Sequence, residues 1–167
     1  PPRPRAGSNA ALDVAAGAGR DAVYLALHGY DVEARDRDPL ALARAAALAA
    51  RHGARIATVL TDLERDEVAL PVARFHLVVC FRYLHRPLFG QIERALAPAG
   101  HLVYATFRVG QEKVGRPRRE RFLLRPGELE SSFPSLEVLH YAEEEPLGGP
   151  VTARLLARKP GAALVPG

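Results

Sequence analysis

The sequence predicts an α/β fold in which helices cover both faces of a doubly wound, Rossmann-like sheet. Strand-like and helix-like segments alternate along most of the chain, a glycine turn follows the first strand-like segment, and residues 75–81 are apolar almost throughout. A continuously apolar strand is typical of a parallel sheet that is covered on both faces. The 167 residues suit one domain with its own core.

The first half of the chain alternates between strand and helix. Asp38 and Pro39 provide an N-cap carboxylate followed by proline at the first helical position, and Gly29 and Gly53 stand where helices commonly end. We expect strands at 11–16, 32–35, 56–60 and 75–81, and helices at 20–28 and 39–52.

The second half continues the alternation and then changes character after the fifth strand. We expect a helix at 87–96, a strand at 101–107, a long polar and basic loop at 108–124, a short helix at 126–133, and strands at 136–142 and 151–158 joined by a hairpin-like connection. Five strand-then-helix repeats indicate a parallel sheet, whose ligands bind at the carboxyl ends of the strands. The predicted domain is 11–159, with flexible ends at 1–10 and 160–167.

Composition narrows the class of protein. Hydrophobic residues make up 48% and charged residues 25% of the chain, as in soluble globular proteins. No apolar run is long enough to span a bilayer, no signal peptide is visible, and Cys80 is the single cysteine, so we expect a cytoplasmic protein without a membrane partner. The chain contains no Met, which indicates that its start has been trimmed.

The glycine turn is the strongest functional motif. The stretch from Asp13 to Arg20 follows the first strand and contains Gly17 and Gly19. Glycines let the backbone approach a ligand, and the helix N-terminus behind them favours an anionic group. In S-adenosylmethionine that group is the methionine carboxylate, and Asp13 could accept from the amino group. The alternative is a tight turn without a ligand.

Two further carboxylates follow the second and third strands. Asp36 is placed to accept hydrogen bonds from the two hydroxyls of a ribose, while Asp38 caps the next helix. Asp62 could accept from the exocyclic amine of adenine, with the backbone of Leu63 against the ring. The alternatives are a solvated loop charge at Asp36 and a turn residue at Asp62.

These residues resemble the class I S-adenosylmethionine-dependent methyltransferases. The stretch Leu12–Arg20 is similar to their first motif, Asp-x-x-x-Gly-x-Gly, and Ala97–Leu102 is similar to their entry into the fifth strand. The resemblance implies seven strands, six of them parallel, with the last one antiparallel and inserted between the fifth and sixth. It implies S-adenosylmethionine as the cofactor, no metal, and these cofactor-binding residues: Asp13, Ala15, Gly17, Gly19, Arg20, Asp36, Arg37, Asp62, Leu63 and Phe81.

The segments 82–89, 104–107 and 122–129 resemble a bacterial subgroup related to tellurite-resistance and thiopurine-type methyltransferases. That subgroup usually has a small polar residue at the position of Arg82 and a cysteine at the position of Ala16. It also usually has a helical segment before the first strand, where this sequence has residues 1–10. We expect a small-molecule acceptor. The candidate acceptor residues are Arg82, Tyr83, His85 and Arg86. Tyr83 and His85 are also candidate bases, and no catalytic residue is assigned.

Three other functions fit parts of the sequence. Gly17, Gly19 and Ala22 match a nicotinamide dinucleotide fingerprint, although Asp13 and Asp62 do not belong to it. The short segment before the first strand is consistent with a non-catalytic or partner-dependent protein of the same fold. A basic loop could contact RNA, although we do not expect nucleic-acid binding because the loop has almost no interleaved aromatic residues. Its cationic residues are Lys113, Arg116, Arg118, Arg119 and Arg121.

Overall fold

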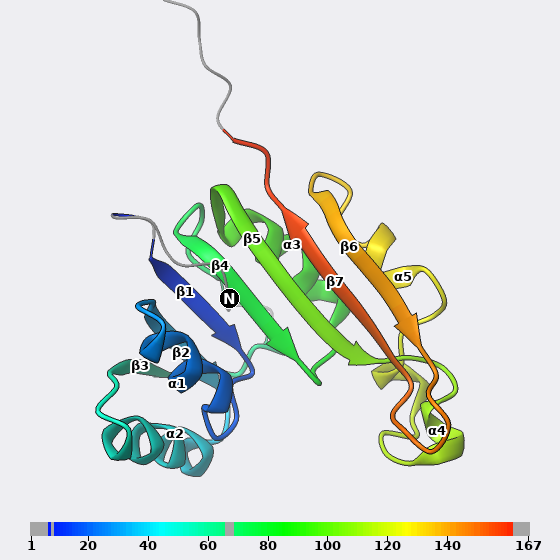
Figure 1. The fold of residues 1–167 in the computed structure, drawn as a ribbon, viewed down its shortest axis with the longest axis horizontal. Helices are drawn as coiled ribbons and strands as arrows, with labels where there is room; N and C mark the ends of the chain where they lie inside the picture. Colours follow the sequence, from blue (N-terminus) through cyan, green and yellow to red (C-terminus); the bar gives the residue numbers. More distant parts are fainter. Residues whose placement is uncertain (1–6, 8, 66–68, 162–167) are drawn as a thin grey trace, which may run out of the picture.

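The computed structural model describes residues 7, 9–65 and 69–161 and contains a seven-stranded sheet with the order β3-β2-β1-β4-β5-β7-β6 (Figure 1). All neighbouring strands are parallel except β7, which is antiparallel to both β5 and β6. The predicted fold class and the position of the antiparallel last strand are confirmed. The strands are β1 Ala10–Val14, β2 Asp31–Asp36, β3 Ile56–Leu60, β4 Phe75–Phe81, β5 Leu96–Phe107, β6 Glu137–Glu144 and β7 Thr152–Arg158.

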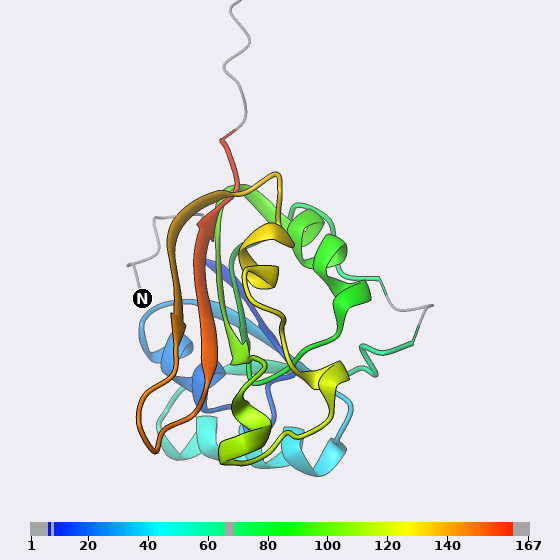
Figure 2. The same ribbon diagram turned by 90° about the vertical axis from the view of Figure 1, so that its right-hand side faces the viewer.

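Helices lie on both faces of the sheet, as expected. Figures 1 and 2 show α3 and α5 on one face, while α1 lies on the other with α2 beside it. The larger apolar core contains side chains of α3 and α5, and the smaller one contains Ala22 and Leu25 of α1. The helices are α1 Arg20–Leu27, α2 Pro39–Arg51, the 3-10 turn η1 Arg86–Leu88, α3 Phe89–Ala95, α4 Gln111–Val114, the 3-10 turn η2 Glu120–Phe122 and α5 Glu128–Ser131.

The helix signals of the first half act as the sequence predicts. The Asp38 carboxylate accepts a hydrogen bond of 2.9 Å from the Leu40 backbone amide, and Pro39 is the first residue of α2. Gly29 and Gly53 follow α1 and α2 with φ values of +90° and +67°, which glycine adopts without steric cost. Asp38 therefore marks the turn at the carboxyl end of β2, while Gly29 and Gly53 precede the starts of β2 and β3.

Three segments differ from the expectation. No helix follows β3 in residues 61–65 and 69–74, so the alternation is interrupted there. Strand β5 begins at Leu96 and not at 101, because the β4–β5 pairing shifts register between Phe75 and Leu77 and so accommodates Pro98 in an irregular entry. The expected loop 108–124 contains α4 and η2, and the helix expected at 126–133 is confined to α5.

The first strand begins near the N-terminal end of the described residues, and the last strand in sequence ends near their C-terminal end. Strand β1 already begins at Ala10, and β7 ends at Arg158. Most of the two ends expected to be flexible, residues 1–6, 8 and 162–167, lie outside the described residues. Within the part of the chain that the structure describes, no helix is both long and apolar enough to cross a membrane.

Candidate functional site

Two cavities adjoin at the carboxyl ends of the parallel strands. The first has a volume of about 420 Å³ and lies over β2, β3 and β4, and the second has a volume of about 700 Å³ and lies over the glycine turn, β4, β5 and β7. Ala15, Arg82, Thr106 and Phe107 line both cavities. Ligands of doubly wound sheets bind at this edge, and the candidate residues after β1, β2, β3 and β4 meet here.

The glycine turn consists of residues in the left-handed backbone region. Ala15, Gly17 and Gly19 have φ values of +56°, +53° and +75°. A Cβ at Gly19 would lie 2.4 Å from the Cβ of Ala45 in α2, whereas a Cβ at Gly17 would meet no protein atom within 4 Å. Gly19 therefore allows α1 to approach α2, while Gly17 leaves an open stretch of backbone that lines the second cavity.

Asp13 lies below the turn and has an unused carboxylate oxygen. Its side chain is buried, and Oδ2 has no hydrogen-bond partner. Burial, and secondly the charge of Asp21, raises the pKa of Asp13 to about 8. A buried oxygen without a partner costs free energy, and a cationic ligand group would remove that cost.

The backbone holds the Asp36 carboxylate in a fixed position at the end of β2. Oδ2 accepts from the Gly17 amide at 2.8 Å, and Oδ1 accepts from the Asp38 amide at 2.9 Å. The carboxylate thus joins the glycine turn to the start of α2 and lines the first cavity. Each oxygen retains a lone pair that can accept a further hydrogen bond.

The segment after β3 forms the opposite wall of the first cavity. The Asp62 carboxylate accepts from the Glu64 amide at 3.2 Å, and the Leu63 side chain is buried in the larger core. Arg37 and Glu64 form an ion pair of 3.5 Å between the two loops. The cavity therefore has carboxylates on two sides, and Arg37, Asp62 and Leu63 all line it.

The residues after β4 divide between the two cavities. Phe81 lines the second cavity together with Arg20, Tyr83 lines the first, and Arg82 lines both. Burial, and secondly the Glu64 charge, raises the pKa of Tyr83 well above its ordinary value, so its hydroxyl stays protonated at neutral pH. That hydroxyl is buried without a partner and can donate a hydrogen bond, but it does not supply a base.

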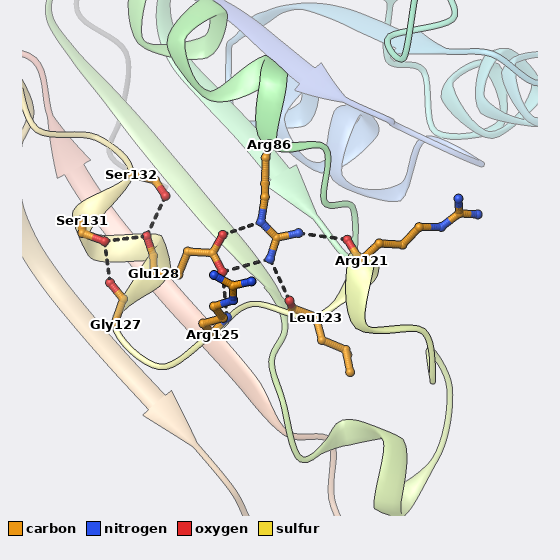
Figure 3. A network of polar contacts seen from close by, with 8 residues as sticks. All are labelled: Arg86, Arg121, Leu123, Arg125, Gly127, Glu128, Ser131 and Ser132. Atoms are coloured by element: carbon orange, nitrogen blue, oxygen red, sulfur yellow. Dashed lines mark hydrogen bonds and ion pairs between the residues drawn. The ribbon is translucent and has the colours of Figure 1, made fainter.

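The other two candidate acceptor residues lie away from the cavities. His85 and Arg86 line neither of them. In Figure 3 the Arg86 guanidinium faces Glu128 and donates to its carboxylate, and it also donates to the backbone carbonyls of Arg121 and Leu123 at 3.0 and 2.9 Å. We call this group of four residues the Arg86 clamp. It fastens the segment after η2 to the start of η1, so the structure gives Arg86 a loop-holding contact.

The sequence analysis did not assign the walls that come from the second half of the chain. Thr106 and Phe107 end β5, and Thr152 and Arg154 belong to the antiparallel β7, whose neighbours were not visible in the local pattern. Pro117, Arg121 and Phe122 reach the first cavity from the basic loop. The basic charge of that loop was its signal in the sequence, and a solvated surface is sufficient to account for such charge. The strained φ of Ala15 gave no signal because alanine rarely adopts it.

Comparison with known proteins assigns the family. A family model described as a methyltransferase domain matches residues 11–100, which is more than half of the chain. The chain belongs to this methyltransferase domain family. The matched range contains the glycine turn, Asp36 and Asp62, and it ends before the part of β5 that lines the cavities.

Solved structures share the fold of this methyltransferase domain at low sequence identity. TehB from Haemophilus influenzae aligns with a TM-score of 0.75 and 21% identity over 91% of this chain, and the alignment spans 58% of the TehB chain. An S-adenosylmethionine-dependent methyltransferase from Mesorhizobium loti aligns with a TM-score of 0.73 and 20% identity over 95% of this chain and 93% of its own. The N-methyltransferase NodS from Bradyrhizobium japonicum aligns with a TM-score of 0.71 and 20% identity over 91% of this chain and 86% of the NodS chain. No curated protein matches the sequence.

Proposed function

We propose that this methyltransferase domain binds S-adenosylmethionine, with the adenosyl part in the first cavity and the methionine part at the glycine turn, and transfers its methyl group to a small-molecule acceptor in the cytoplasm. One observation carries the proposal: Asp36 and Asp62, which follow different strands, line the same cavity beside the glycine turn. Carboxylates so placed suit the ribose hydroxyls and the exocyclic amine of an adenosyl group.

The glycine turn suits the methionine part of the cofactor. The open backbone at Gly17 would accept the approach of the carboxylate, and the amides at the start of α1 offer a positive dipole end. The unpartnered Oδ2 of Asp13 would accept from the amino group. In this assignment Arg37 and Leu63 border the adenosyl group, while Gly19 supports the turn through its contact with α2.

The side chains of the site can align the reacting molecules more readily than they can donate or remove protons. S-adenosylmethionine supplies a sulfonium-bound methyl group, which passes to an acceptor atom as the new bond forms and the sulfur–carbon bond breaks. The protein would hold the adenosyl and methionine parts so that the methyl group is aligned with the acceptor atom. Tyr83 remains protonated, and His85 lies outside both cavities, so neither supplies a base.

The resemblance of segments 82–89, 104–107 and 122–129 to the tellurite-resistance and thiopurine-type subgroup favours a soft acceptor. TehB is among the proteins with the same fold. We therefore propose small thiols and chalcogen oxyanions as the first acceptors to screen. Such nucleophiles need no protein base, which agrees with the side chains that line the two cavities.

Calorimetry of the chain with S-adenosylhomocysteine, with NADH as the control, tests the cofactor assignment. We expect micromolar binding of S-adenosylhomocysteine and none of NADH. Binding of NADH alone would overturn the proposal in favour of a nicotinamide dinucleotide domain. Binding of S-adenosylhomocysteine without turnover on any acceptor would instead favour a non-catalytic protein of this fold.

A further inference from the structure

The second cavity has a floor formed by three adjacent strands. Phe81 of β4 pairs with Ala105 of β5, and Ala105 pairs with Arg154 of β7, so these three residues form one row across the sheet. Phe107 of β5 pairs with Thr152 of β7 in the next row. Paired residues point to the same face of a sheet. The floor is therefore apolar over β4 and β5 and becomes polar at β7.

Arginines surround this apolar floor. Arg20 begins α1, Arg82 follows β4, and Arg154 lies on β7, and all three line the cavity together with Asp21. Arg154 is paired with Glu144 at 2.7 Å. In the residues that the structure describes, the Arg20 and Arg82 guanidiniums form no hydrogen bond or ion pair. Burial raises the pKa of Asp21, and the positive charges of Arg82 and Arg20 oppose that shift.

Arg82 occupies the central position of the site. It lines both cavities, and its backbone amide donates to the Ala105 carbonyl at 2.8 Å, which fixes its position against β5. Its φ is +56°, a conformation that arginine rarely adopts. The side chain therefore extends from a backbone that is held in place, at the boundary between the proposed cofactor cavity and the cavity beside it.

We propose that the part of the second cavity over β4, β5 and β7 is the acceptor site and that it takes molecules in which an anionic group is attached to an apolar body, with Arg82 selecting the negative charge. This inference rests on the proposed function, because it assumes that the adenosyl part of the cofactor occupies the first cavity and that its methionine part occupies the glycine-turn end of the second. The apolar body would lie on Phe81, Ala105 and Phe107. The anionic group would accept from the free Arg82 guanidinium and from the Thr152 hydroxyl, which has no partner.

The test uses a matched pair of probes, naphthalene-2-carboxylate and its neutral amide, naphthalene-2-carboxamide. Their affinities are measured by calorimetry, with and without saturating S-adenosylhomocysteine. The proteins are the wild type, Arg82→Gln, Phe107→Ala, and Arg118→Gln as a control that removes an exposed arginine outside both cavities. The binding of S-adenosylhomocysteine to each protein is measured separately.

We expect the wild type to bind the carboxylate about tenfold more tightly than the amide, because a charge-assisted contact is made only with the carboxylate. Arg82→Gln should remove this preference, Phe107→Ala should weaken both probes, and Arg118→Gln should change neither. The affinity of Arg82→Gln for S-adenosylhomocysteine should stay within about threefold of the wild-type affinity, which is a difference in binding free energy of less than about 1 kcal/mol.

Equal affinities for the two probes in the wild type would overturn the inference. It would also be overturned if Arg118→Gln lost the preference for the carboxylate as fully as Arg82→Gln, or if Phe107→Ala bound both probes as tightly as the wild type. A loss of S-adenosylhomocysteine binding in Arg82→Gln as large as the loss of the carboxylate would assign this arginine to the methionine carboxylate instead. Failure of the wild type to bind S-adenosylhomocysteine, with the probe preference intact, would contradict the proposed function and leave an anion site in the second cavity.

Discussion

The glycine turn and the Arg86 clamp lie at the same edge of the sheet but differ in whether their polar groups have hydrogen-bond partners. At the turn, Oδ2 of Asp13 has no partner and Gly17 leaves open backbone. In the clamp, the Arg86 guanidinium donates to the Glu128 carboxylate and to two backbone carbonyls, and the same carboxylate accepts from the Arg125 amide (Figure 3). Since buried polar groups are normally paired, the unpaired oxygen at the turn supports our proposal that a ligand binds there.

Charge alone did not distinguish the two regions. Arg86 and Arg82 lie four positions apart, and both were candidate acceptor residues. The structure separates them, because the partners of Arg86 come from the protein while the Arg82 side chain has no hydrogen bond or ion pair in the described residues. An arginine most of whose donors are used inside the protein holds a loop, and an arginine with free donors beside a cavity can hold a ligand.

The largest effect should come from Gly17→Val. Its side chain would enter the space left for the ligand and adopt an unfavourable φ, so S-adenosylhomocysteine affinity should fall about 100-fold or more. Gly19→Val should act differently, because its Cβ clashes with Ala45 and the domain should lose about 3 kcal/mol or more of stability. Calorimetry and urea unfolding of both variants separate the two roles. A Gly17 variant that binds normally would refute the assignment of the turn.

Asp36→Ala should have the next largest effect. It removes the proposed ribose acceptor and two hydrogen bonds from backbone amides. We expect S-adenosylhomocysteine affinity to fall about 10- to 100-fold and the unfolding free energy to fall by about 1 kcal/mol. Asp38→Ala is the matched control, because it removes only a helix cap and should lower stability without a comparable loss of affinity.

Asp13 should make ligand binding dependent on pH. Burial raises the pKa of its carboxyl group to about 8, and an ammonium group beside it would favour the ionised form. S-adenosylhomocysteine affinity should therefore increase between pH 6 and pH 8, with proton release, by up to about tenfold per pH unit. Titrations in buffers of different ionisation enthalpy measure the proton release.

The same shift has the opposite consequence for the free protein. An acid whose folded pKa lies above its unfolded value of 3.8 binds more protons when folded, so it lowers stability progressively as pH rises from about 4 to 8. Asp13→Asn should abolish both pH effects and weaken ligand binding. If affinity in the wild type is flat across pH 6–8, Asp13 does not contact the amino group.

Disruption of the Arg86 clamp should have the smallest effect on binding. Arg86→Gln removes donors to Glu128 and to two carbonyls on a partly exposed surface, so we expect a loss of about 1–2 kcal/mol of stability. S-adenosylhomocysteine affinity should stay within about threefold of the wild type. Arg86 holds the pKa of Glu128 below its ordinary value of 4.5, so the clamp's contribution should be complete above that pH and be lost as the pH falls through the lowered pKa.

The sequence predicted the first half of the fold more closely than the second. The cap at Asp38, the glycines after α1 and α2, and the apolar run of β4 are local signals, and the elements lie within about two residues of their predicted bounds. The order of the last strands depends on long-range pairing, and only the family resemblance supplied it. The short helices α4 and η2 lie in a polar segment without apolar periodicity.

The candidate site was predictable where it depends on the ends of strands. Asp36 and Asp62 follow β2 and β3, and parallel topology brings them together without further information. The roles of Gly17 and Gly19 could not be separated, because only the packing of α1 against α2 shows which glycine is enclosed. The walls contributed by Phe107, Thr152 and Arg154 depend on the antiparallel pairing of β7.

Hydrogen–deuterium exchange with and without S-adenosylhomocysteine tests the central claim most directly, because it compares the two regions in one experiment. We expect the ligand to slow exchange at the amides of residues 15–19, 36–38 and 62–64, and to leave residues 123–128, which line neither cavity, unchanged. Protection confined to 123–128, or equal in the two regions, would show that the ligand does not bind at the glycine turn and would contradict the assignment of the site.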